Sequence, residues 1–188
     1  MKKSMCKFLT LLVSLLPINV VEAQEHLKFM GIPLTGSIDN FQSKLAAKKV
    51  YPNKEYNRTT PFGQRQFNGR FAGRDCMINV FYSDDKTVYG ATVGCFERDW
   101  QVHDNYYNEV KDLLESKYPD AKEENSSRNG LPNITFVIPR KSNDIPMGFI
   151  ELARSKITKN YDTVYYTIIT YTDMLGGFGD YMDKYGDL

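Results

Sequence analysis

The stretch Asp75–Phe96, DCMINVFYSDDKTVYGATVGCF, indicates a β-hairpin whose register can be derived from the sequence. We centre the turn on Asp85-Lys86, since aspartate suits tight turns for backbone reasons. Side chains alternate between the two faces of a strand, so residues opposed across the turn share a face. The opposed pairs on the more apolar face are Cys76–Cys95, Ile78–Val93, Val80–Ala91 and Tyr82–Tyr89. This hairpin is therefore predicted to form the centre of an antiparallel sheet that is covered on one side.

The two cysteines of the hairpin, Cys76 and Cys95, are predicted to form a disulfide. Opposed positions on neighbouring strands lie ~4.5–5.5 Å apart between Cα atoms, a separation that a disulfide can bridge. A bond that closes so short a loop contributes roughly 3 kcal/mol in the chain-entropy model. The alternative is a pair of small apolar thiols packed in the core. An oxidising compartment favours the bond.

The amino terminus indicates such a compartment, because residues 1–23 have the pattern of a secretory signal peptide. Three lysines precede the apolar run FLTLLVSLLPINVV, and the small residue Ala23 stands at the expected cleavage site. Pro17 and Asn19 interrupt the run, which is too short to span a bilayer comfortably. We expect a periplasmic or secreted protein, with an uncleaved anchor as the alternative.

The expected mature chain is nearly neutral. Cleavage removes three of the 24 basic and one of the 23 acidic side chains, which leaves 21 and 22. Nucleic-acid binding would call for a basic face, and attachment to anionic lipid for a basic cluster. The overall charge favours neither, and we expect no nucleic-acid partner and no membrane span after cleavage.

Residues 24–173 are predicted to form a single α+β domain, in which an antiparallel sheet of about six strands carries two helices on one face. The helices are expected at about 38–50, capped by Ser37, and at about 100–118, capped by Asp99. The strands are expected at about 67–73, 76–82, 89–95, 133–138, 147–156 and 163–172. Residues 121–133 are predicted to be a solvated loop, and residues 174–188 a loosely held tail.

Each half of the domain is predicted to hold one helix followed by three strands. The two helix exits are alike, KKVYPNKEYN at 48–57 and SKYPDAKEEN at 116–125. Similar units in sequence indicate an internal αβββ duplication. Chance agreement of a short tyrosine–proline match is the alternative.

The order of these signals resembles a family of small exported proteins of unknown function from gut Bacteroidetes. The matching stretches are FMGIPLTGSIDNFQSKL, FNGRFAGRDCMINVFY, GFIEL, VYYTIITYTD and the terminal Asp187-Leu188. Family members more often have Lys-Tyr-Gly where this chain has Lys117-Tyr118-Pro119. The αβββ duplication is also similar to the architecture of β-lactamase inhibitor protein, an analogy toward protein binding that cannot establish function. The resemblance implies no catalytic residues.

Candidate catalytic and metal-binding groups are few. His103 and Asp104 could act as a base and an orienting acid, but we favour a solvated polar face of the helix. Two facing cysteines supply at most two metal ligands, and clustered ligands at metal-site spacing are missing from the sequence. We therefore predict no catalytic residue, no metal, no cofactor and no enzymatic activity.

The aromatic content offers a binding surface, since all 13 tyrosines belong to the expected mature chain. The last strand alternates Tyr165 and Tyr171 on one face with Tyr166 on the other, so one set must lie on the face away from the helices. Tyrosine combines a large contact area with a polar group, which suits sugars, apolar ligands and proteins. We predict ligand binding at Tyr161, Tyr165 and Tyr171. The alternative is that tyrosine merely suits half-buried strands.

These observations favour a non-catalytic exported binding or interaction module that uses an aromatic open sheet face, with a protein or glycan as its partner. One alternative is a hydrolase that acts on a glycan or peptide through carboxylates brought together by the fold. Another is a structural component of an envelope assembly. Paired carboxylates in a concave pocket would favour the hydrolase, and a flat aromatic surface would favour binding.

Overall fold

The computed structural model describes residues 25–128, 130–141 and 145–175. In chain order the elements are β1 (Lys28–Phe29), β2 (Ile32–Pro33), α1 (Ile38–Ala47), β3 (Tyr51–Pro52), the 3-10 helix η1 (Tyr56–Arg58), β4 (Gln64–Phe71), β5 (Arg74–Tyr82), β6 (Val88–Glu97), α2 (Trp100–Lys117), β7 (Lys122–Arg128), β8 (Leu131–Ile138), β9 (Gly148–Lys159) and β10 (Asp162–Asp173). The predicted signal peptide and residues 176–188 of the predicted tail lie outside the described residues.

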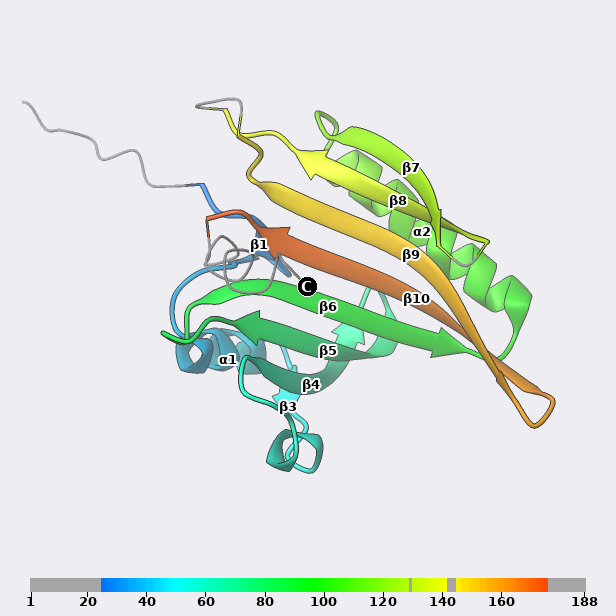
Figure 1. The fold of residues 1–188 in the computed structure, drawn as a ribbon, viewed down its shortest axis with the longest axis horizontal. Coiled ribbons are helices and arrows are strands. Elements are labelled where there is room, and N and C mark those ends of the chain that lie inside the picture. Colours follow the sequence, from blue (N-terminus) through cyan, green and yellow to red (C-terminus); the bar gives the residue numbers. More distant parts are fainter. Residues whose placement is uncertain (1–24, 129, 142–144, 176–188) are drawn as a thin grey trace, which may run out of the picture.

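Eight strands form one antiparallel sheet in the order β3-β4-β5-β6-β10-β9-β8-β7, and β1 and β2 form a small second sheet. Both helices lie on the same side of the large sheet, behind it in Figure 1. The predicted α+β class and antiparallel sheet are therefore confirmed. The predicted number of strands is too low, because the large sheet has eight.

The hairpin of β5 and β6 lies near the middle of this sheet, and its predicted register holds as far as the pair Phe81–Gly90. Its confirmed pairs on the buried face include Ile78–Val93 and Val80–Ala91. The predicted opposition of Tyr82 and Tyr89 is wrong, because a bulge places Tyr82 opposite Val88. Such a bulge adds one residue to one strand and shifts every pairing beyond it.

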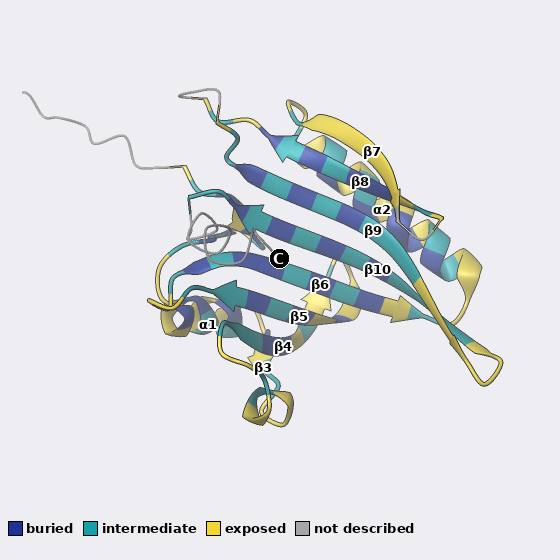
Figure 2. Ribbon diagram, in the orientation of Figure 1, coloured by how far each residue is buried: buried dark blue, intermediate teal, exposed yellow. Residues whose placement is uncertain are grey.

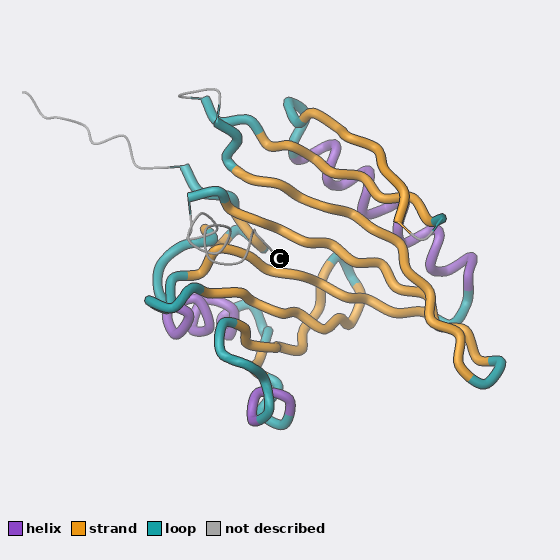
Figure 3. The backbone as a smooth tube through the Cα atoms, viewed as in Figure 1, coloured by secondary structure: helices purple, strands orange, loops and turns teal. Residues whose placement is uncertain are grey.

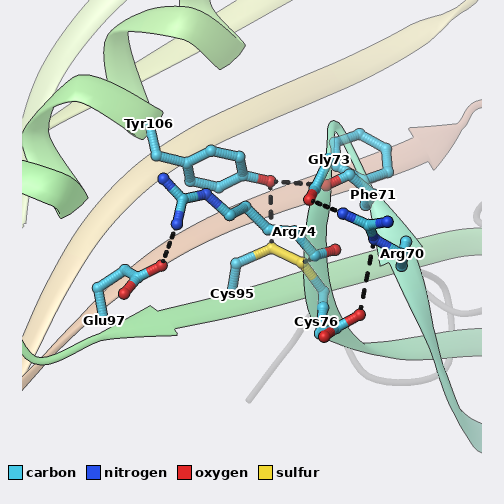
Figure 4. Close-up of a disulfide and its surroundings, with 9 residues drawn as sticks. Arg70, Phe71, Gly73, Arg74, Cys76, Cys95, Glu97 and Tyr106 are labelled. Carbon is cyan, nitrogen blue, oxygen red and sulfur yellow. Dashed lines mark hydrogen bonds and ion pairs between the residues drawn. A yellow bond between two sulfur atoms is a disulfide. The ribbon is translucent and has the colours of Figure 1, made fainter.

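Cys76 and Cys95 are joined as a disulfide, with their Cα atoms 4.5 Å apart. The Tyr106 side chain reaches from α2 to this bond, as Figure 4 shows. The Tyr106 hydroxyl lies 3.2 Å from Cys95 Sγ and donates a hydrogen bond to the Phe71 carbonyl at 3.1 Å. Burial raises the pKa of Tyr106 to about 12, so its hydroxyl keeps the proton that it donates.

Both helices begin at the predicted caps. The Ser37 hydroxyl accepts the Asn40 N–H at 3.3 Å, and an Asp99 carboxylate oxygen accepts the Val102 N–H at 2.9 Å. These bonds satisfy backbone donors that have no partner inside the helix. The side chains that the two helices bury against the sheet are Ile38, Phe41 and Leu45 in α1, and His103, Tyr106, Tyr107, Val110 and Leu114 in α2.

The two extra strands lie at the edges of the sheet. The prediction of a loop at 121–133 is wrong, because β7 pairs with β8 from Lys122–Val137 to Arg128–Leu131. All side chains of residues 122–127 are exposed, so no alternation of apolar residues marks this strand in the sequence. Polar and charged side chains are typical of edge strands, which must avoid pairing with other chains. The other extra strand, β3, has only two residues.

The strand order is mirrored about the seam between β6 and β10. The strands after α1 run from the β3 edge to the seam, and those after α2 run from the β7 edge to the same seam. Strands β4 and β8, which occupy matching places, are each 8 residues long. Each helix is followed by four strands of the large sheet, so the predicted three strands per half is too few. The duplication itself stays a prediction.

Candidate binding surface

Among the described residues, no helix covers the front face of the large sheet in Figure 2, where buried and half-buried residues alternate along the central strands. We call this the open face. Residues paired across neighbouring antiparallel strands share a face, so its rows can be followed from strand to strand. One row of the open face consists of Asn68, Met77, Gly94, Ile168, Ala153 and Asn133.

An apolar patch surrounds Gly94 at the seam. We define the Gly94 patch as Met77, Gly94, Phe96, Tyr166 and Ile168. Met77 and Ile168 are the cross-strand neighbours of Gly94, and Phe96 pairs with Tyr166 one row further along. Met77 is 40% exposed and Phe96 is 55% exposed. A Cβ atom at Gly94 would meet nothing within 4 Å, so the backbone at the centre of the patch is open to an incoming group.

A polar row lies beside this patch. Its members, in order across the sheet, are Gln66, Asn79, Thr92, Thr170, Glu151, Thr135 and Glu124. The Thr92 and Thr170 hydroxyls are 3.1 Å apart across the seam, within hydrogen-bond distance. The open face thus offers hydroxyls and amides next to apolar side chains, as binding surfaces for proteins and ligands commonly do.

Two carboxylates of this row face the same way, from β9 and β7. Glu151 accepts a hydrogen bond from the Asn133 amide at 2.7 Å. Glu124 accepts one from the Lys122 ammonium at 2.8 Å, and this bond raises the pKa of Lys122. Because β8 lies between their strands, roughly 10 Å separates the two backbones. Each carboxylate thus has a hydrogen-bond partner of its own.

The predicted ligand-binding tyrosines lie elsewhere. Tyr171 is only 3% exposed and packs on the helix-covered side, with its ring 5.3 Å from that of Phe29. Tyr165 lies on the same side, with its ring 5.2 Å from that of Trp100 and 5.6 Å from that of His103. The prediction that Tyr165 and Tyr171 form an open aromatic face is wrong, because the pairing of β10 with β6 turns this set toward the helices.

Tyr161 has a third environment, at the tip of the β9–β10 hairpin, where its side chain is fully exposed. The structure therefore does not bring the three predicted tyrosines together. The tyrosine that the open face does carry is Tyr166, which pairs with Phe96. One feature of the sequence points to it, since Tyr166 shares its strand face with threonines at 170 and 172, which suit a solvated face.

The predicted solvated position of His103 is also wrong, because its side chain is 1% exposed and lies between α2 and the sheet. Its ring lies 5.4 Å from that of Trp100. Burial, followed by the nearby Arg154 cation, lowers the pKa of His103. Asp104 does not orient this imidazole, since its carboxylate lies 2.7 Å from an Arg154 nitrogen.

Several buried polar atoms around His103 have no hydrogen-bond partner among the described residues. They are both ring nitrogens of His103, the Tyr107 hydroxyl, Arg154 Nε and the Thr167 hydroxyl. The Arg154 guanidinium lies 4.0 Å from the centre of the Tyr107 ring, which stabilises the cation there. This cluster fixes α2 on the sheet through rings and charge, with few hydrogen bonds.

Within the described part of the chain, no three His, Cys, Asp or Glu side chains are grouped so that they could hold a metal ion. Neither α1 nor α2 has the length and hydropathy of a helix that crosses a membrane. Comparisons with protein-family models, with curated proteins and with solved structures found no match. The resemblance to exported Bacteroidetes proteins stays a prediction.

Proposed function

We propose that this protein is a non-catalytic exported binding or interaction module whose contact surface is the open face of the sheet. The observation that carries the proposal is the Gly94 patch, where exposed Met77 and Phe96 flank an uncovered stretch of backbone. Contiguous exposed apolar residues beside polar groups are typical of sites that contact another molecule. The partner is a protein or a glycan, because both fit apolar and aromatic side chains beside hydroxyls and amides.

The carboxylates of the open face support binding over hydrolysis. A glycosidase needs two carboxyl groups that converge on one bond, one of them protonated. Glu151 and Glu124 are instead held apart, because each makes its own hydrogen bond, with Asn133 and Lys122 respectively, and β8 lies between their strands. This pair therefore does not converge on one bond.

The position of the patch also fits a duplicated module. Gly94 in β6 and Ile168 in β10 are paired across the seam where the two helix-plus-strand halves meet. We propose that duplication created this seam, so that each half supplies part of the surface. Export is supported by the Cys76–Cys95 disulfide, since such bonds persist in oxidising compartments.

A blocking substitution at the centre of the patch tests this function. Gly94→Arg adds a long charged side chain where a Cβ meets nothing within 4 Å, so the fold should tolerate it. Wild-type protein would be used to capture partners from the native envelope fraction and to probe a glycan array. For each protein or glycan that the wild type captures, we expect Gly94→Arg to bind at least about tenfold more weakly. A tenfold loss of affinity corresponds to about 1.4 kcal/mol of binding free energy.

The matched control is Leu113→Arg, because Leu113 is an exposed apolar residue of α2, 57% exposed, on the other side of the sheet. This variant should bind like the wild type. Equal binding by Gly94→Arg and the wild type, with unchanged circular dichroism, would disprove the open face as the contact surface.

A further inference from the structure

The β9–β10 hairpin extends beyond the sheet, as Figures 1 and 3 show at one end of the molecule. Its own pairing runs to Lys159–Asp162. The neighbouring strands stop earlier, since β6 pairs with β10 only from Tyr165 and β8 pairs with β9 only as far as Ala153. The last residues of β9 and the first residues of β10 therefore project into solvent.

The tip of this hairpin carries an aromatic residue in a conformation that suits glycine. Asn160 and Tyr161 are the two residues between the last pair, with φ of 51° and 65°. A two-residue turn with positive φ at both positions is of type I′, which favours asparagine first and glycine second. Tyrosine at the second position is sterically disfavoured.

Nothing inside the described fold explains this tyrosine. Tyr161 has a relative exposure of 105%, and its ring makes no contact or hydrogen bond with the residues that the structure describes. Ile157, 56% exposed, adds a second apolar side chain to the projecting part. Residues with a strained backbone conformation cluster at functional sites. The strain at Tyr161 is not offset by packing within the protein, so a contact with another molecule would explain it.

The charge around the tip is positive. Lys156 and Lys159 are exposed, and no described carboxylate lies within ion-pair distance of either. The acid of the tip, Asp162, lies 3.7 Å from Arg98 and is balanced by it. A nearly neutral chain thus has a local excess of cations beside its most exposed aromatic residue.

We propose that the tip of the β9–β10 hairpin rests on an anionic lipid surface, with Tyr161 and Ile157 in the headgroup region. Tyrosine favours this region because it has an apolar ring and a polar hydroxyl. Lysines near an anionic membrane each contribute about tenfold or less in affinity. With two apolar side chains and two lysines the contact is weak, reversible and sensitive to salt.

End-on contact leaves the open face available. The Gly94 patch lies on the face of the sheet, whereas the tip of the β9–β10 hairpin, which contains Tyr161, extends beyond the end of the sheet (Figure 1). The protein could therefore hold a partner on the open face while it rests on a membrane. The lipid contact does not depend on the proposed function, and the Gly94→Arg variant should bind lipid like the wild type.

Co-sedimentation with lipid vesicles tests the proposal. One set of vesicles would contain equal parts of phosphatidylcholine and phosphatidylglycerol, and the other phosphatidylcholine alone. We expect the wild type to bind the anionic vesicles at low salt, and Tyr161→Ser and the double variant Lys156→Gln/Lys159→Gln to lose about tenfold in affinity. The controls are Tyr51→Ser, at a tyrosine that is 57% exposed on the β3 edge, and Lys44→Gln/Lys48→Gln on and after α1.

A tryptophan at the tip gives a second readout. The chain has one tryptophan, Trp100, so Trp100→Phe combined with Tyr161→Trp moves the reporter to position 161. Its emission should shift to the blue on anionic vesicles and be quenched by lipids with brominated acyl chains. The lipid contact would be overturned if the wild type did not bind anionic vesicles, or if the tip variants bound them as well as the controls do. Failure of the wild type to bind would instead indicate that Tyr161 inserts into a pocket of a partner protein.

Discussion

Tyr161 is the residue at which the backbone and the side chain have opposing preferences. Its φ of 65° lies in the left-handed region, where an L-residue with a Cβ costs roughly 1–2 kcal/mol. Its neighbour Asn160 tolerates the same region well. The strain is therefore confined to one position, which makes it accessible to a single substitution.

Tyr161→Gly should raise the free energy of unfolding by about 0.5–1 kcal/mol. Relief of the strain exceeds the extra conformational entropy that glycine brings to the unfolded chain, about 0.4–1 kcal/mol. Urea unfolding measures the change, with Tyr161→Phe as a control that keeps the strain and should leave stability unchanged. A glycine variant that is less stable than the wild type would contradict the type I′ turn.

Glycines of the sheet differ in what a side chain would meet. Gly94→Ala should change stability by less than about 0.5 kcal/mol, because its Cβ enters open space. Gly148→Ala should cost several kcal/mol, about 3 or more, because its Cβ would collide with the Thr172 carbonyl. Urea unfolding of both variants checks the contrast. Equal stabilities would mean that β6 and β9 are not oriented as described.

At the scale of elements, helix α2 is held on the sheet by two different contacts. Toward its middle, Tyr106 rests on the disulfide. Near its start, His103 lies among the rings of Trp100 and Tyr165 with the Arg154 cation nearby. The contact at Tyr106 depends on the oxidised state of the two cysteines, and the contact at His103 depends on pH.

Acidification should weaken the docking of α2. The folded state lowers the pKa of His103 below its ordinary 6.5, first by burial and then through Arg154, although the Tyr166 backbone, Asp104 and Glu97 oppose the shift. As pH falls below about 6.5 the unfolded chain binds a proton that the folded chain does not, so stability is lost.

Urea unfolding between about pH 7 and pH 5 measures this loss. The loss should be smaller in His103→Phe, a variant that keeps the second histidine, His26. Parallel pH profiles for the two proteins would contradict a neutral, buried His103.

Loss of the disulfide should cost about 3 kcal/mol in the variant Cys76→Ala/Cys95→Ala, since the two cysteines are 19 residues apart in sequence. Thermal unfolding with and without a reductant measures this effect, and the double variant should no longer respond to the reductant. A thiol-reactive label should find neither Cys76 nor Cys95 free in the unreduced, denatured protein. Labelling of both would contradict the bond.

At the scale of the whole molecule, local patterns predicted more than long-range pairing did. The caps at Ser37 and Asp99 and the hairpin of β5 and β6 were predictable, because neighbouring residues determine them. Strand β7 was not, since an edge strand with polar side chains on both faces has no periodic pattern.

The proposed binding surface was predictable only in part, because an open sheet face was expected but the wrong tyrosines were assigned to it. Both faces of β10 carry aromatic and apolar residues, so composition cannot choose between the sets of Tyr165 and Tyr166. The pairing of β10 with β6, a strand distant in sequence, determines which set faces the helices. His103 was misplaced for a similar reason, since polar Asp104 and Asn105 beside it in sequence hid its place on the buried side of α2.

Single cysteines placed along β10 would test most directly which face of the sheet is open. Ile168→Cys and Tyr166→Cys should react with a small thiol reagent at rates close to those of an exposed cysteine, because both positions lie on the open face. Thr167→Cys and Ile169→Cys should stay protected, since both positions are fully buried under the helices. Protection at 166 and 168, or the reverse alternation, would show that the face is covered and would contradict the proposed binding surface.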